Sequence, residues 1–201
     1  MSLIKMKLGF IVNPIAGMGG RVGLKGTDDV LKEAIAKGAE PIAPKRATEF
    51  LQKLKENKAE IAIEVLTCPG IMGEKEAKAA DFPVHVLPMT IEEETSAEDT
   101  KTAVRLLIAA TVDLIVFVGG DGTAKDILDA MQVHSEVPVL GVPSGVKMYS
   151  GVFAVNPLDA VDVVLAFAEK QAEIIEFEII DADEKAIRSD AFSVKLHGFL
   201  K

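Results

Sequence analysis

The sequence predicts an α/β fold, a three-layer domain with helices on both faces of a mostly parallel sheet, followed by a short antiparallel segment. Five short apolar stretches alternate with stretches whose apolar residues recur at helical spacing. One of them, residues 114–118, is continuously apolar, as in a strand that is buried on both faces. From residue 172 onward, polar and apolar residues alternate, which is typical of antiparallel strands.

The five predicted strands of the sheet are separated by predicted helices, and this alternation is typical of parallel βαβ units. The strands cover residues 8–12, 61–66, 84–87, 114–118 and 137–142. Beyond the last helix, residues 173–180 and 192–200 are a predicted antiparallel hairpin. An isolated hairpin is only marginally stable in water, so we expect it to pack on another surface.

Residues that favour helix starts mark the predicted helices. Thr27 can cap one helix, and Pro44 and Pro157 fit the first turns of two others. Ser96 and Asp99 have the spacing of a capping box, which predicts a helix start at that point. Another helix follows residue 122, where apolar residues recur three and four positions apart.

Composition excludes several classes of protein. The net charge is -9 and no basic run occurs, which argues against a nucleic-acid partner because such binding depends on Lys and Arg. A single cysteine, Cys68, rules out an internal disulfide and fits a reducing compartment, and its surroundings in sequence suggest a structural thiol. No apolar stretch approaches the roughly 20 residues of a membrane span, and no secretory signal is evident. We therefore expect a cytoplasmic protein without a membrane partner.

A glycine-rich turn joins the buried strand at residues 114–118 to the next helix. It contains Gly119, Gly120 and Gly122, which allow a backbone to approach an anion closely. The helix N-terminus adds positive potential, and Thr123 can cap the helix or donate to a phosphate oxygen. Asp121 repels phosphate, so its presence indicates a bound divalent cation or a proton acceptor for an attacking hydroxyl. The alternative is a tight turn in which Asp121 only caps the helix.

Two further polar glycine loops follow predicted strands. One covers residues 13–26, where Arg21 and Lys25 can offset phosphate charge. Its alternative interpretation is a surface loop with two solvated cations. The other covers residues 143–147. Since the carboxyl ends of parallel strands lie at one edge of a sheet, we expect all three loops to meet in one crevice. The end of the second strand, residues 67–70 with Gly73, can also line a site there.

These motifs resemble those of the superfamily of ATP–NAD kinases, diacylglycerol kinases and sphingosine kinases. The resemblance rests on GGDGT at residues 119–123, on Val12-Asn13-Pro14 with the glycines that follow, and on GVPSGVK at residues 141–147. Two longer stretches, residues 12–29 and 141–157, look most similar to the prokaryotic ATP–NAD kinase branch that includes acetoin-catabolism kinase-like proteins. The chain departs from the pattern at Val146, where Thr is usual, and at Met148, where Asn is common. We therefore do not expect the hydroxyl and amide contacts that Thr and Asn make at these two positions in relatives.

The resemblance implies phosphoryl transfer from ATP, or from polyphosphate, to a hydroxyl group, with NAD as the acceptor and Mg²⁺ as a cofactor. It implies that Asp121 is the catalytic residue and a metal ligand. Thr95, Asp99 and Thr100 lie near the nucleotide in relatives, but helix capping explains this stretch adequately. Residues expected to hold the phosphates and nucleotide are Asn13, Pro14, Gly17, Gly19, Gly20, Lys25, Gly119, Gly120, Gly122, Thr123, Pro143, Ser144, Gly145 and Lys147.

The resemblance also implies a domain division. Residues 1–171 would form the nucleotide-binding kinase domain, and residues 172–201 would begin a second β domain that is incomplete here, so the chain is expected to be truncated or naturally short. An unfinished β domain has an exposed edge, which favours a homo-oligomer. Two other functions remain open, namely a kinase of another small hydroxyl compound or lipid, and a non-catalytic nucleotide-binding module.

Overall fold

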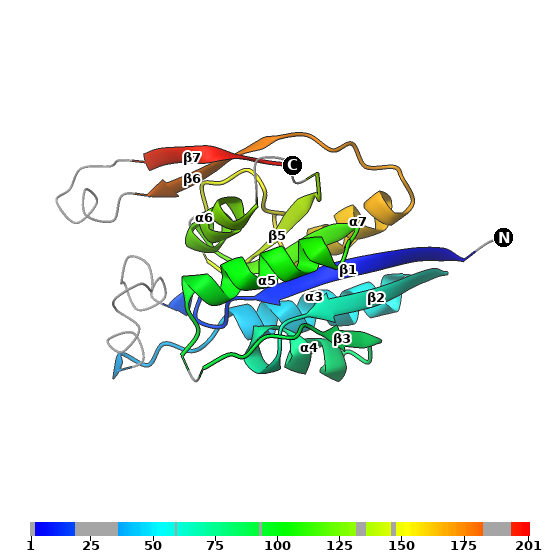
Figure 1. The fold of residues 1–201 in the computed structure, drawn as a ribbon, viewed down its shortest axis with the longest axis horizontal. Helices are drawn as coiled ribbons and strands as arrows, with labels where there is room; N and C mark the ends of the chain where they lie inside the picture. Colours follow the sequence, from blue (N-terminus) through cyan, green and yellow to red (C-terminus); the bar gives the residue numbers. More distant parts are fainter. Residues whose placement is uncertain are drawn as a thin grey trace.

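The computed structural model describes residues 3–18, 36–58, 60–92, 94–131, 136–145, 148–182 and 194–201. Within them, a five-stranded sheet lies between two layers of helices, and a separate two-stranded sheet lies outside one of these layers (Figure 1). This arrangement confirms the predicted α/β fold class. The helix predicted to start at Thr27 lies outside the described residues.

The sheet consists of β1 (Ile4–Val12), β2 (Ile61–Thr67), β3 (Val84–Val86), β4 (Leu114–Gly119) and β5 (Val139–Pro143). The strand order is β3-β2-β1-β4-β5, and each neighbouring pair is parallel. All residues of β4 are buried, as its continuous apolar run predicts. β5 starts later than predicted because Pro138 has no backbone N–H with which to pair.

Helices α3 (Ala43–Asn57), α4 (Glu74–Ala79) and α7 (Pro157–Ala168) pack on one face of the sheet, and α5 (Ala97–Ala109) and α6 (Asp121–Ala130) pack on the other. Helix α5 starts at the predicted capping box, where Asp99 accepts a hydrogen bond from the Ser96 N–H at 2.8 Å. Helix α4 and the short 3-10 turn η1 (Gly70–Met72) before it were not predicted from the sequence. They are too short to show a helical repeat of apolar residues.

The antiparallel hairpin consists of β6 (Phe177–Ala182) and β7 (Val194–Leu200). Ile179 and Leu200 are buried in the same core cluster as residues of α5 and α6, so the hairpin has the packing surface that it was expected to need (Figure 1). The end of the chain also reaches the sheet, because the Val139 N–H donates to the Lys201 carbonyl at 2.7 Å. The division of the chain at residue 171 stays a prediction.

The outer edge of β5 is covered by residues 152–154. The Gly141 N–H donates to the Val152 carbonyl at 2.8 Å, and the Ala154 N–H donates to the Gly141 carbonyl at 2.9 Å. In the part of the chain that the structure describes, no helix is both long enough and apolar enough to cross a bilayer.

Glu76 on α4 is a buried carboxylate whose ionisation should destabilise the fold. Its side chain is 8% exposed, and its Oε2 atom has no hydrogen-bond partner among the described residues. Burial raises the pKa of the Glu76 carboxyl above its usual value. Above about pH 4, the Glu76 carboxyl therefore binds more protons in the folded chain than in the unfolded chain. Its ionisation destabilises the fold increasingly as the pH rises from about 4 towards the raised pKa of the folded state.

We expect Glu76→Gln to flatten the pH dependence of stability and to raise the urea midpoint at pH 7 relative to the original chain. Urea unfolding between pH 4 and 8 measures this. Glu74→Gln on the same helix is the matched control with the opposite sign, because the hydrogen bonds from Lys78 and from the Gly70 N–H lower the pKa of Glu74. The stabilisation that the ionised Glu74 carboxylate contributes is lost as the pH falls. Equal pH profiles for Glu76→Gln and the original chain would contradict the assignment.

Candidate functional site

The described parts of the three glycine loops lie together at the carboxyl edge of the sheet. In chain order, the first loop is residues 13–26, the second is residues 119–123 and the third is residues 143–147. The Asn13 N–H donates to the Val118 carbonyl at 3.0 Å, and the Ser144 N–H donates to the Gly119 carbonyl at 3.0 Å. Gly17 lies so close to the third loop that a Cβ atom there would be 2.1 Å from the Ser144 carbonyl oxygen, and its φ of +80° also favours glycine. The described parts of all three loops are therefore in mutual contact.

The first two loops follow β1 and β4, the two strands at which the strand order reverses. From β1 the sheet continues to β2 and β3, and from β4 it continues to β5 on the other side. Loops that follow such strands diverge, and this leaves a crevice where open α/β sheets bind their ligands. The position of the motif in the fold thus agrees with a binding site.

Thr123 holds the first two loops together. Its side chain is only 3% exposed, and its Oγ1 atom accepts hydrogen bonds from Asn13 Nδ2 at 3.0 Å and from the Gly120 N–H at 3.4 Å. A Cβ atom at Gly119 would lie 2.5 Å from Thr123 Oγ1, so this side chain requires glycine at position 119. Thr123 therefore closes the first turn of α6, as the capping interpretation expected.

Gly120 is a glycine that the fold does not require. A Cβ atom there would have no heavy atom within 4 Å, and its φ of −123° is open to any residue. The open space lies beside the first turn of α6, where backbone N–H groups lack partners within the helix. Gly122, the second residue of α6, is exposed at the same place. A ligand with negative charge fits this space.

Asp121 is held by the segment that follows the third loop. Its carboxylate is 8% exposed; Oδ2 accepts from the Tyr149 N–H at 2.8 Å and Oδ1 accepts from the Ser150 N–H at 2.9 Å. Its oxygens thus bind a neighbouring segment, whereas the N-cap position of α6 belongs to Gly120. A carboxylate has about four lone-pair sites, so each oxygen retains acceptor capacity for a further donor or a cation. The sequence did not point to Tyr149 and Ser150, because backbone donors leave no signature in residue type.

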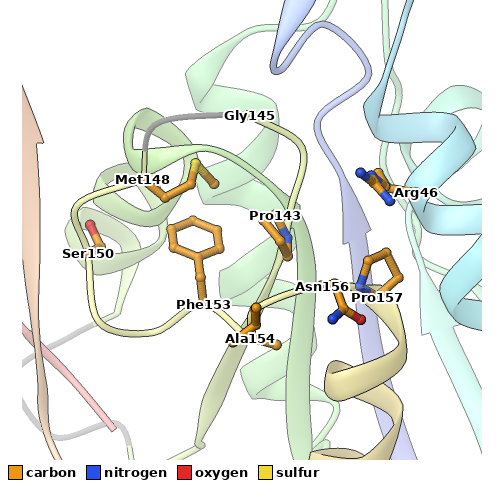
Figure 2. Close-up of a pocket in the computed structure, with 10 residues that line it drawn as sticks. Arg46, Pro143, Gly145, Met148, Ser150, Phe153, Ala154, Asn156 and Pro157 are labelled. Atoms are coloured by element: carbon orange, nitrogen blue, oxygen red, sulfur yellow. The ribbon is translucent and has the colours of Figure 1, made fainter.

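The third loop borders a cavity of about 380 Å³. Figure 2 shows Met148, Ser150 and Phe153 on one side of Pro143, with Arg46 of α3 and Asn156 on the other. Arg46 was missed by sequence reasoning because only the fold brings α3 beside β5. Its guanidinium also contacts the Glu49 carboxylate at 3.1 Å.

Ser144 is buried in the third loop and has an unsatisfied hydroxyl group. It is 3% exposed, and its Oγ atom has no hydrogen-bond partner among the described residues. Such a group carries a desolvation cost of about 1–3 kcal/mol. Of the other predicted residues, Asn13, Gly17, Pro143 and Gly145 are half-buried and Pro14 is buried.

A second cavity of about 530 Å³ lies beyond the ends of β2 and β3, between residues 69–71 and residues 89–92. Pro69 and Gly70 line it, as expected, but Cys68 is fully buried behind it. Burial raises the pKa of the Cys68 thiol to about 12, so the thiol is protonated at neutral pH and is not a nucleophile. This agrees with a structural role for Cys68. Gly73 does not line the cavity. A Cβ at position 73 would lie 2.2 Å from Thr67 Oγ1, so glycine there leaves room for the Thr67 side chain.

Some predicted site residues lie outside the described residues, so their roles stay predictions. They are Gly19, Gly20, Arg21, Lys25 and Lys147. Near α5, Asp99 caps the helix and Thr100 is buried, in agreement with the capping interpretation.

The donor set restricts the kind of metal site. The described residues contain no group of three or more His, Cys, Asp or Glu side chains placed to hold an ion. In the described parts of the three loops, Asp121 is the one carboxylate. Because Mg²⁺ is often held by one or two carboxylates together with substrate phosphates, Asp121 fits an ion that arrives with a phosphate ligand.

Comparison with known proteins identifies a family for most of the chain. Residues 8–171 match the family described as the ATP-NAD kinase N-terminal domain. Two solved structures from Bacillus anthracis str. Sterne, both described with the words diacylglycerol kinase, are 19% identical to the chain over 89% of its length, with TM-scores of 0.42 and 0.39. The chain covers 44% and 47% of those two chains, which is less than half of each. No match was found among curated proteins.

The contrast between Gly119 and Gly120 can be tested by matched substitutions. We expect Gly119→Ala to destabilise the fold by about 1–3 kcal/mol, because its Cβ would displace the β-branched Thr123 side chain. Gly120→Ala should change stability by less than about 0.5 kcal/mol, since its Cβ meets open space. Urea unfolding measures both. Equal losses in the two variants would contradict this account of the turn.

Proposed function

Because the chain belongs to the ATP-NAD kinase family through its N-terminal domain, we propose that it is a phosphotransferase that phosphorylates NAD to NADP with ATP. The finding that carries the proposal is the open space beside Gly120, at the N-terminus of α6 and next to a fixed carboxylate. Neither packing nor backbone conformation requires glycine there. A ligand phosphate that approaches the backbone closely would require glycine at this position.

The positive end of α6 and the backbone of Gly120 and Gly122 would bind the phosphates of the donor. Asp121 would lie next to the transferred group, oriented by two N–H donors whose positions are fixed by the backbone. The bond between the γ-phosphorus and its bridging oxygen breaks, a bond to the acceptor oxygen forms, and the acceptor proton moves to Asp121. Mg²⁺ bound to the donor would neutralise phosphate charge.

Arg46 and the unpaired Ser144 hydroxyl are further groups that suit a nucleotide. Arg46 projects from the first turn of α3 at the wall of the cavity next to the third loop (Figure 2). A guanidinium can bind a phosphate through two parallel hydrogen bonds. A ligand that supplies a partner to Ser144 Oγ would remove the desolvation cost of that buried hydroxyl.

Ligand binding is the first test of the proposal. We expect ATP with Mg²⁺, and NAD or NADP, to raise the unfolding temperature, because a ligand at about 100 times its Kd stabilises the folded state by about 2.7 kcal/mol. Thermal unfolding with ATP, ADP, NAD and NADP, with and without Mg²⁺, measures this. Gly120→Ala is the control, as its Cβ should weaken the ATP effect without changing the stability of the free chain.

Each outcome of this screen distinguishes one function from another. A shift with ATP alone would replace NAD by another hydroxyl compound or a lipid as acceptor. Shifts with ATP and NAD, together with a separate activity assay that detects no NADP, would indicate a nucleotide-binding module. No shift with any nucleotide would contradict the proposal.

Substitution of Asp121 tests the chemistry. We expect Asp121→Asn to lower turnover by about 10²–10⁴, the usual range for loss of a general base. The circular dichroism spectrum should be retained, since Asn keeps one acceptor oxygen for the Tyr149 or Ser150 N–H. Asp113→Asn is a matched control, because Asp113 accepts a backbone hydrogen bond from the Lys7 N–H at 2.7 Å next to the opposite end of β4. Similar losses in both variants would contradict a chemical role for Asp121.

A further inference from the structure

Ser150 makes hydrogen bonds in two directions. Its backbone N–H donates to Asp121 Oδ1 at 2.9 Å. Its hydroxyl group donates to the Ile180 carbonyl and accepts from the Ile180 N–H, both at 3.0 Å. Ser150 is only 6% exposed, so water has little access to replace these bonds. One residue therefore joins the Asp121 carboxylate to strand β6.

The neighbouring residues reinforce this connection. The Gly151 N–H donates to the Glu178 carbonyl at 3.0 Å, and a Cβ at Gly151 would lie 2.7 Å from the Phe177 ring. On the other side, the Tyr149 N–H donates to Asp121 Oδ2. Residues 149–151 are thus held between the N-terminus of α6 and the hairpin.

The hairpin is also attached to α6 directly. Ile179 is fully buried in the core cluster that contains Ile127 of α6, and a Cβ at Gly198 would lie 3.0 Å from the Leu128 side chain. The hairpin therefore has a fixed position relative to the helix that carries Asp121. Ser150 has hydrogen bonds both to this hairpin and to the carboxylate.

We propose that Ser150 is a positioning residue for Asp121, and that its hydroxyl group couples the orientation of the carboxylate to the docking of the β6–β7 hairpin. The kinetic part of this proposal rests on the proposed function, whereas the structural coupling does not. Loss of the hydroxyl leaves the Ser150 N–H and the hydrogen bond from Gly151 to Glu178 in place, but it removes both hydrogen bonds between Ser150 and Ile180. Both donors to Asp121 then gain freedom, and the carboxylate loses its fixed orientation.

Amide hydrogen exchange tests the coupling without any assay of activity. In Ser150→Ala, we expect the amides of Tyr149, residue 150 and Ile180 all to exchange about tenfold faster. Similar increases at the three amides are expected if they open as one local unit. In Asp121→Asn, the Ile180 amide should also exchange faster, although it does not touch Asp121. Faster exchange of the Ile180 amide alone in the first variant, or no change at Ile180 in the second, would overturn the coupling.

Kinetics test the positioning role. We expect Ser150→Ala to lower kcat about tenfold with less than a twofold change in the KM for ATP, as for an interaction needed in the transition state. Ser150→Thr retains the hydroxyl and should restore most of the lost kcat. Ile63→Val is the control, since it removes buried volume from β2 in the other core cluster, away from the three loops.

The outcomes separate this proposal from the proposed function. A kcat loss shared by Ile63→Val would overturn the positioning role. The positioning role would also be overturned if Ser150→Thr had the exchange rates of the original chain but did not restore kcat. If the original chain transfers no phosphoryl group, the proposed function fails and the exchange measurements alone decide the coupling.

Discussion

The arrangement of the site depends on one buried contact, the packing of Thr123 between Gly119 and Asn13. The Thr123 hydroxyl accepts hydrogen bonds from the first loop and from the second, and its side chain occupies the space that a Cβ at Gly119 would need. This contact fixes the first turn of α6 relative to the ends of β1 and β4. Gly119 and Thr123 thus serve the shape of the turn, whereas the packing of the turn does not require glycine at position 120.

Much of the fold could be predicted because the signals are local. The continuous apolar run of β4, Pro44 in the first turn of α3 and the capping box of α5 each specify their element within a few residues. Helix α4 has six residues, too few for a periodic pattern. The bulge between Ile179 and Ile180 was also not predicted, because it arises from pairing with β7.

The site was predictable only in part. The glycines and Asp121 could be singled out as candidates, because they directly follow a continuous apolar stretch. Their partners could not, because Asp121 is held by backbone N–H groups, which every residue except proline has. Arg46 likewise lies about a hundred residues from Pro143 in sequence and reaches the same cavity only through the packing of α3 and α7.

The burial of Cys68 gives the chain a chemical reporter of its own motion. The thiol is fully buried beyond the end of β2, and its raised pKa keeps it unreactive while the surrounding core is closed. A thiol reagent therefore modifies the single cysteine only when that part of the core opens, so the labelling rate reports the opening equilibrium there. For the same reason, a second cysteine placed on the surface could be labelled selectively without removing Cys68.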